Sequence, residues 1–170
     1  MIVLGLDPGS AYTGYGVIRI DESGEVHHVM HGVVALKKGL SLADKLVRLD
    51  TELEKLMNQY KPSEVAVEKI FLGKNADSAF KLGHVRGVCM MQAKKHGADI
   101  FEYAPRRVKK IVTGFGAADK DQVRWMVLSL LKIKSSEKDD ATDALALAVC
   151  HSRERQALNA LKSLEARRIL

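Results

Sequence analysis

This 170-residue chain contains few cysteines and no long uninterrupted apolar segment. The two cysteines, Cys89 and Cys150, lie in apolar stretches that favour helices, so we expect reduced core residues rather than a disulfide. No basic leader followed by an apolar stretch opens the sequence, and no apolar run approaches the length of a membrane span. These features predict a soluble, cytoplasmic protein that does not contact membranes.

The sequence also lacks internal repeats, low-complexity tracts and an obvious domain linker. Its length suits one domain with a substantial hydrophobic core. We expect that domain to cover residues 1–152. Residues 153–170, with leucines spaced by three, are expected to form a C-terminal helical extension or a tail.

Basic residues are distributed unevenly along the chain, whose formal net charge is +6. Residues 69–138 hold 15 Lys or Arg and 6 Asp or Glu, whereas the remainder holds 12 and 15. A solvated basic face is the ordinary explanation of such a surplus. A basic segment between acidic residues also fits a polyanion that lysines hold while carboxylates act on it, and nucleic acid is the natural candidate.

Hydrophobic periodicity predicts an α/β fold. The expected strands cover residues 2–6, 14–20, 26–34, 64–67 and 99–103. The expected helices cover residues 41–60 and 77–96, a short basic segment after Pro105, a segment opened by Asp119 and Gln122, and a last segment from about Asp139. Three hairpin strands followed by alternating helices and strands imply a mixed five-stranded sheet flanked by helices, which is the ribonuclease H-like arrangement.

Four acidic residues occupy the ends of these predicted elements. Asp7 ends an apolar run before Pro8 and Gly9, and Glu68 follows another apolar run. Asp140 and Asp143 stand at i and i+3, which places them on one side of the first turn of a helix. Taken singly, each acid has an ordinary explanation as a turn, loop or helix-capping residue.

Together, the four acids favour a metal site. Strand ends and a helix start can converge at the carboxyl edge of one sheet. Carboxylate oxygens are the ligands that hard divalent cations prefer. The combination therefore predicts a Mg²⁺-dependent nuclease. Spacing alone does not decide which acid accompanies Asp143, because Asp139 and Asp140 can both reach its face of the helix.

Three segments resemble the RuvC family of crossover-junction endodeoxyribonucleases: LGLDPGSAYTGYGV at 4–17, VEKIFLGKNADSAFKLGHVRGV at 67–88 and DATDALALA at 140–148. The resemblance covers about residues 1–151, and the second segment is long and specific. It implies a homodimeric, Mg²⁺-dependent nuclease that cuts two symmetry-related strands of a four-way Holliday junction. It also implies a complex with a branch-migration helicase.

The resemblance assigns roles to individual residues. The metal ligands would be Asp7, Glu68, Asp140 and Asp143, which selects Asp140 over Asp139. Further candidates would contact DNA: Phe71 at the junction centre, Lys74 in the same segment, and Lys109 and Lys120 beside the scissile phosphate. Without the resemblance, Phe71 could equally be a core residue and the lysines would be solvated.

The expected mechanism uses two Mg²⁺ ions, for which Mn²⁺ could substitute. Asp7 is expected to bridge the ions, Glu68 to hold the ion on the nucleophile side, and Lys120 to offset the charge that develops on the phosphate. The expected product is a nick with a 5′-phosphate.

A stripe of small residues, Ala79, Gly83 and Gly87, recurs every four residues on one predicted helix. It permits close packing either against the protein's own sheet or against a second subunit, and a two-fold dimer would supply two equivalent cuts. Two rival functions are an actin-like phosphotransferase, which would need a second domain, and a junction-binding protein without catalysis, which would not need all four acids.

The spacing of two histidines is a further pattern that could indicate a metal site. His27 and His31 have a spacing that binds zinc on a helix, but they fall on a predicted strand, roughly 13 Å apart. We therefore expect no zinc site from this pair.

Overall fold

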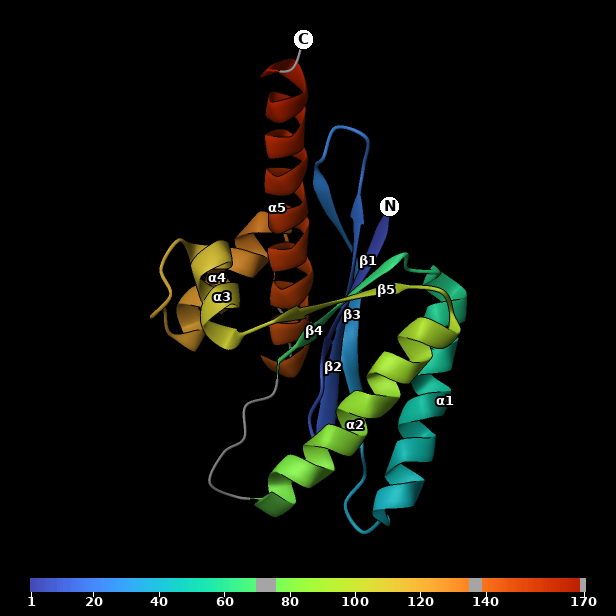
Figure 1. The fold of residues 1–170 in the computed structure, drawn as a ribbon. Coiled ribbons are helices and arrows are strands. Elements are labelled where there is room, and N and C mark those ends of the chain that lie inside the picture. Colours follow the sequence, from blue (N-terminus) through green and yellow to red (C-terminus); the bar gives the residue numbers. More distant parts are fainter. Residues whose placement is uncertain (70–75, 135–138, 169–170) are drawn as a thin grey trace.

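A computed structural model describes residues 1–69, 76–134 and 139–168. Its five strands form one sheet in the order β3-β2-β1-β4-β5 (Figure 1). The strands are β1 (Ile2–Asp7), β2 (Tyr12–Ile20), β3 (Val26–Ala35), β4 (Glu64–Glu68) and β5 (Asp99–Tyr103). The helices are α1 (Leu42–Tyr60), α2 (Ala76–Lys95), α3 (Pro105–Thr113), α4 (Lys120–Leu130) and α5 (Asp139–Arg168).

The sheet is mixed, as the sequence predicts. Strands β1, β2 and β3 form an antiparallel meander, whereas β4 pairs in parallel with β1 and β5 pairs in parallel with β4. The parallel arrangement places the carboxyl ends of β1 and β4 at the same edge. Residues that end these two strands therefore lie beside each other.

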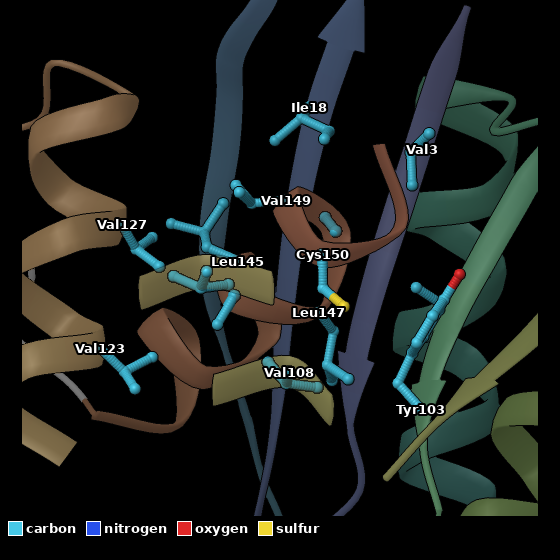
Figure 2. Packing of buried hydrophobic residues seen from close by; sticks show 14 of the residues in the cluster. Val3, Ile18, Tyr103, Val108, Val123, Val127, Leu145, Leu147, Val149 and Cys150 are labelled. Carbon is cyan, nitrogen blue, oxygen red and sulfur yellow. The ribbon is translucent and has the colours of Figure 1, made fainter. Parts of the chain in front are cut away.

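Two hydrophobic cores cover the two faces of the sheet. Alternate residues of each strand point to opposite faces, so Leu4 and Leu6 pack with α1 and α2, whereas Val3 packs with α3, α4 and α5. Figure 2 shows the second core, in which Leu145 and Val149 of α5 lie between the sheet and Val123 and Val127 of α4. The cysteines are free and buried, one in each core, as expected.

Local sequence signals explain where several helices begin and end. Ser41 caps α1 by accepting a hydrogen bond from the Asp44 amide, and Pro62 follows the left-handed residue Lys61 that ends the helix. Asp119 and Gln122 form the predicted capping box of α4. This capping box fixes the start of α4, which is where Lys120 lies.

Helix α5 lies unusually close to β1 and β2 because glycines face it. A Cβ atom added to Gly5 would lie 2.0 Å from the Ala144 carbonyl oxygen, and one added to Gly14 would lie 2.0 Å from that of Asp140. At Gly16 an added Cβ would lie 2.8 Å from the Leu145 nitrogen. Only glycine leaves room for the helix backbone at these positions.

The predicted elements are confirmed, with small shifts at their ends. Strand β2 begins at Tyr12, two residues before the expected start, and β1 and β4 each include their terminal acid. The register of the pairing between β2 and β3 shifts between Val17 and Ile18, which the sequence did not indicate. Helix α5 continues to Arg168, and the division of the chain at residue 152 stays a prediction. None of the helices in the described part of the chain has the length and apolar character needed to cross a membrane.

The substitution Gly5→Ala should destabilise the protein by about 1–3 kcal/mol, because the new methyl group overlaps the α5 backbone and forces the helix away from the sheet. Urea unfolding followed by circular dichroism would measure the change. Gly116→Ala is the matched control, since its added Cβ would meet Arg106 and Lys110 atoms only at 3.6 and 3.8 Å, which is ordinary contact distance. Equal stabilities of the two variants would show that α5 adjusts without cost.

Candidate active site

Asp7 and Glu68 lie on the sheet face that α5 covers. The alternation of strand residues places Asp7 on the same face as Val3 and Gly5, both of which face α5. By the same alternation, Glu68 shares a face with Ala66. The two acids follow Leu6 and Val67, which are partners in the parallel pairing of β1 with β4. The sheet therefore brings these two carboxylates together.

The first turn of α5 adds Asp140 and Asp143 to the same place. All four acids line a cavity of about 390 Å³. Its other walls come from α3, α4 and α5: Pro105, Val108, Lys109, Lys120, Val123, Ala146 and Leu147. The predicted convergence of acids from two strands and a helix thus agrees with the geometry, and both predicted lysines of the helical region join them.

Crowding of the carboxylates changes their acidity. Burial, together with the charges of Glu68, Asp143 and Asp140, raises the pKa of Asp7 from 3.8 to about 8. Burial and the charge of Asp143 also raise the pKa of Glu68, and burial raises that of Asp143. The chain therefore holds negative charge here at a cost in free energy that a bound cation would remove.

Lys120 forms an ion pair with one of these acids. Its Nζ atom lies 3.4 Å from Oδ2 of Asp143, and its side chain is 77% exposed. The charge of Asp143 raises the pKa of Lys120, while the charge of Lys120 offsets part of the increase in the pKa values of Asp7, Glu68 and Asp143. An exposed, weakly held lysine can move from Asp143 to a phosphate that enters the cavity.

Asp139 is placed outside this cavity. It forms an ion pair with Arg124 of α4, whereas Asp140 lines the cavity together with Asp143. Thr142, between the two acids, is buried, and its Oγ1 has no hydrogen-bond partner among the described residues. Of the two acids that spacing left open, Asp140 therefore shares the cavity with Asp143, and its role as a metal ligand stays a prediction.

The family model described as "Crossover junction endodeoxyribonuclease RuvC" matches residues 3–151. A protein of that name from Legionella pneumophila is 45% identical over 160 residues, which cover 94% of this chain and 91% of the relative. The chain belongs to the RuvC family. It is therefore a metal-dependent nuclease of the Holliday junction resolvase type, which functions in DNA recombination and repair.

Solved structures agree with the RuvC assignment and with the ribonuclease H-like fold. The structure of Thermus thermophilus RuvC superposes on this chain with a TM-score of 0.84 at 28% sequence identity. The match covers 92% of this chain and 96% of the Thermus chain. A structure titled T. thermophilus RuvC in complex with Holliday junction substrate has the same TM-score and coverage at 25% identity.

The donor set of the cavity fits a hard divalent cation. All four acidic side chains offer carboxylate oxygens, the ligands that Mg²⁺ and Mn²⁺ take, and burial together with their mutual repulsion raises the pKa of Asp7. Cationic neighbours in the cavity are limited to Lys109 and Lys120 among the lining residues. A metal-dependent RuvC-family nuclease would therefore hold its cation here.

A second group of potential ligands lies at the opposite end of the sheet, in the β2–β3 turn and at the start of β3. Ligand atoms of Asp21, Glu25 and His27 lie within 4.8 Å of one another. Both carboxylate oxygens of Asp21 already have hydrogen-bond partners within the protein. Oδ1 accepts hydrogen bonds from Ser23 and from the Glu25 amide, and Oδ2 lies 2.7 Å from Nε2 of His27. These bonds hold the pKa of Asp21 well below its usual range and explain the cluster as a stabilised turn.

His27 and His31 both lie on strand β3, as the sequence predicts. His27 bonds to Asp21, whereas His31 bonds to His28 with a nitrogen–nitrogen distance of 2.8 Å. The bulge in the β2–β3 pairing was not visible in the sequence, and the contact between His28 and His31 was therefore missed.

Two predicted DNA-binding residues, Phe71 and Lys74, lie outside the described residues. Another residue near the site was missed altogether. Arg86 of α2 donates a hydrogen bond to the main-chain carbonyl of Glu68 and pairs with Glu102 of β5. Its place within the family-like segment 67–88 was the only available signal.

The variant Asp7→Asn should stabilise the metal-free protein, and the gain should grow with pH. Because the folded-state pKa of Asp7 is raised, the folded chain retains a proton that the unfolded chain loses, so stability falls between pH 4 and about 8. Asparagine removes this loss. In EDTA at pH 8, we expect a melting temperature higher by roughly 5–10 °C, equivalent to about 2–3 kcal/mol.

Scanning calorimetry at pH 5 and pH 8 would measure the gain at each end of this window. Asp139→Asn is the control, because its side chain lies outside the cavity. A gain for Asp7→Asn that is the same at both pH values would contradict the raised pKa of Asp7.

Proposed function

We propose that the protein resolves Holliday junctions as a homodimer that makes paired, Mg²⁺-dependent nicks, with one active site in each subunit. The observation that carries this proposal is the convergence of Asp7, Glu68, Asp140 and Asp143 in one cavity with two lysines. A polyanionic substrate would meet both the acids that hold cations and the lysines that balance its charge.

Each acid has a proposed part in holding two cations. Asp7, on the central strand β1 and surrounded by the charges of the other three acids, would contact both ions. Glu68 would hold one ion, and Asp140 and Asp143 the other. When bound, such a pair of ions activates a water molecule for in-line attack and stabilises the leaving oxygen.

The lysines would act on the substrate phosphate. Lys120 would leave Asp143 and offset the negative charge that develops during cleavage, since its largely exposed side chain lines the cavity that holds the acids. Lys109 of α3 would hold the DNA backbone from another wall of the cavity. The product would be a nick with a 5′-phosphate.

The exposed face of α2 supports the homodimer. An apolar cavity of about 600 Å³ lies over this helix, lined by Leu46, Ala76, Ala79, Phe80, Gly83, His84, Gly87, Val88 and Met91. Added Cβ atoms at Gly83 and Gly87 would meet nothing within 4 Å, so these glycines do not serve packing on their own sheet. Phe80 is 71% exposed, and a second α2 helix would cover it.

The branch-migration helicase and the cytoplasmic location stay predictions. Phe71 and Lys74 also stay proposed DNA contacts on the strength of the RuvC resemblance.

The direct test incubates the protein with a synthetic four-way junction and, separately, with linear duplex, each with Mg²⁺ or EDTA. We expect symmetric nicking of the junction with Mg²⁺, little cutting of the duplex, and none in EDTA. Asp140→Asn should reduce junction cleavage by at least about 100-fold, because it removes a carboxylate beside Asp143, whereas Asp139→Asn should cleave within about twofold of the parent rate.

Junction binding in EDTA is the control for these variants, since Asp140→Asn should bind at least as well as the parent. Equal cutting of junction and duplex would exclude junction selectivity. Loss of cleavage in Asp139→Asn, with Asp140→Asn active, would exclude the proposed ligand set.

The variant Gly83→Leu should weaken dimerisation at least tenfold, because a leucine side chain prevents close approach of two α2 helices. Analytical ultracentrifugation would measure this, and circular dichroism should stay native. Asn58→Leu adds the same side chain to an exposed position of α1 and should leave the dimer unchanged. A dimer in Gly83→Leu with the parent dissociation constant would place the interface elsewhere.

A further inference from the structure

Arg86 connects α2 to the end of strand β4. Its Nε atom donates to the Glu68 main-chain carbonyl at 3.3 Å, and a terminal guanidinium nitrogen lies 2.5 Å from Oε2 of Glu102 on β5. The side chain of Arg86 is only 20% exposed. One partly exposed guanidinium therefore joins a helix to two neighbouring strands.

This contact completes the hydrogen bonding of one peptide unit. The carbonyl of Glu68 accepts from Arg86, while the amide of the next residue, Lys69, donates to the Tyr103 carbonyl at 2.8 Å. Both polar groups of the peptide bond between Glu68 and Lys69 are thus held. The orientation of that peptide plane sets the direction in which the Glu68 side chain leaves the strand.

The arrangement around Arg86 does not suit direct recognition of DNA. Glu102 neutralises the guanidinium, and most of the arginine side chain is buried. A phosphate would have to displace Glu102 to reach the charge. The planar guanidinium is well suited to bridging a carbonyl and a carboxylate, because its donors diverge at fixed angles.

We propose that Arg86, held by Glu102, is a positioning residue that fixes Glu68 for cation binding. The inference rests on the proposed assignment of Glu68 as a metal ligand. It also links two parts of the molecule, because Arg86 lies on the helix whose exposed glycines form the proposed dimer face. Displacement of α2 would be transmitted to Glu68 through this side chain, in addition to the core contacts of α2 with β4.

The test measures cation binding without DNA. Binding of Mn²⁺ to Arg86→Met and to Glu102→Gln would be followed by the electron paramagnetic resonance signal of free Mn²⁺. We expect both variants to bind Mn²⁺ about 10-fold more weakly than the parent, the usual size of effect when a group supporting a metal ligand is removed. Junction cleavage should recover toward the parent rate as Mg²⁺ is raised.

Matched controls come from a second ion pair between the same two elements. Lys94 of α2 lies 3.0 Å from Asp99 of β5, and both side chains are largely exposed. Lys94→Met and Asp99→Asn should leave Mn²⁺ affinity unchanged. Unchanged Mn²⁺ affinity in Arg86→Met and Glu102→Gln, or the same loss in the controls, would overturn the proposal.

Two further comparisons separate the alternatives. If Arg86 contacts phosphate instead, Arg86→Met would weaken junction binding and flatten its salt dependence while Glu102→Gln would not, which overturns the positioning role. Glu68→Gln tests the underlying assignment: if it cleaves normally, the proposed ligand set fails. If it is inactive while both Arg86→Met and Glu102→Gln bind Mn²⁺ normally, only the positioning role fails. If Arg86→Met does not fold, the Mn²⁺ affinity of Glu102→Gln tests the positioning role by itself.

Discussion

The close approach of α5 to the first two strands is the constraint on which the active site depends. At Gly5 and Gly14, the helix backbone occupies the space that a side chain would fill. This contact brings the first turn of α5, with Asp140 and Asp143, down to the sheet edge where Asp7 and Glu68 end their strands. The two apolar cores then hold the layers in place, but they do not set this spacing.

The charge of the four acids opposes the close packing of α5 on the sheet. Packing brings four acids together, and burial raises the pKa of Asp7, Glu68 and Asp143. Lys120 relieves this repulsion only partly, because its amine lies 3.4 Å from Asp143 and is largely exposed. The fold thus stores an unfavourable interaction that cation binding would relieve, as is common where a protein site is built for a charged ligand.

Much of this organisation could be read from the residues. Strand alternation, helix periodicity and the caps at Ser41 and Asp119 located the elements to within a few residues, because these signals are local. The acids were identifiable since strand ends converge in a mixed sheet. The closeness of α5 to Gly5, the bulge beside Ile18 and the bond from Arg86 to Glu68 depend on how distant segments pack, which no local pattern encodes.

The burial of both cysteines makes their thiols unreactive toward labelling reagents. Their thiols lie in the cores, and burial raises the pKa of Cys89 and of Cys150 to about 12, so thiolate is scarce at neutral pH. A cysteine introduced at the exposed Ser163 would therefore be labelled by maleimide dyes without removing the native pair. With a helical rise of 1.5 Å per residue, that dye would stand about 30 Å along α5 from Asp143. Helix α5 would then carry a dye near its carboxyl end and the active-site acids at its amino end.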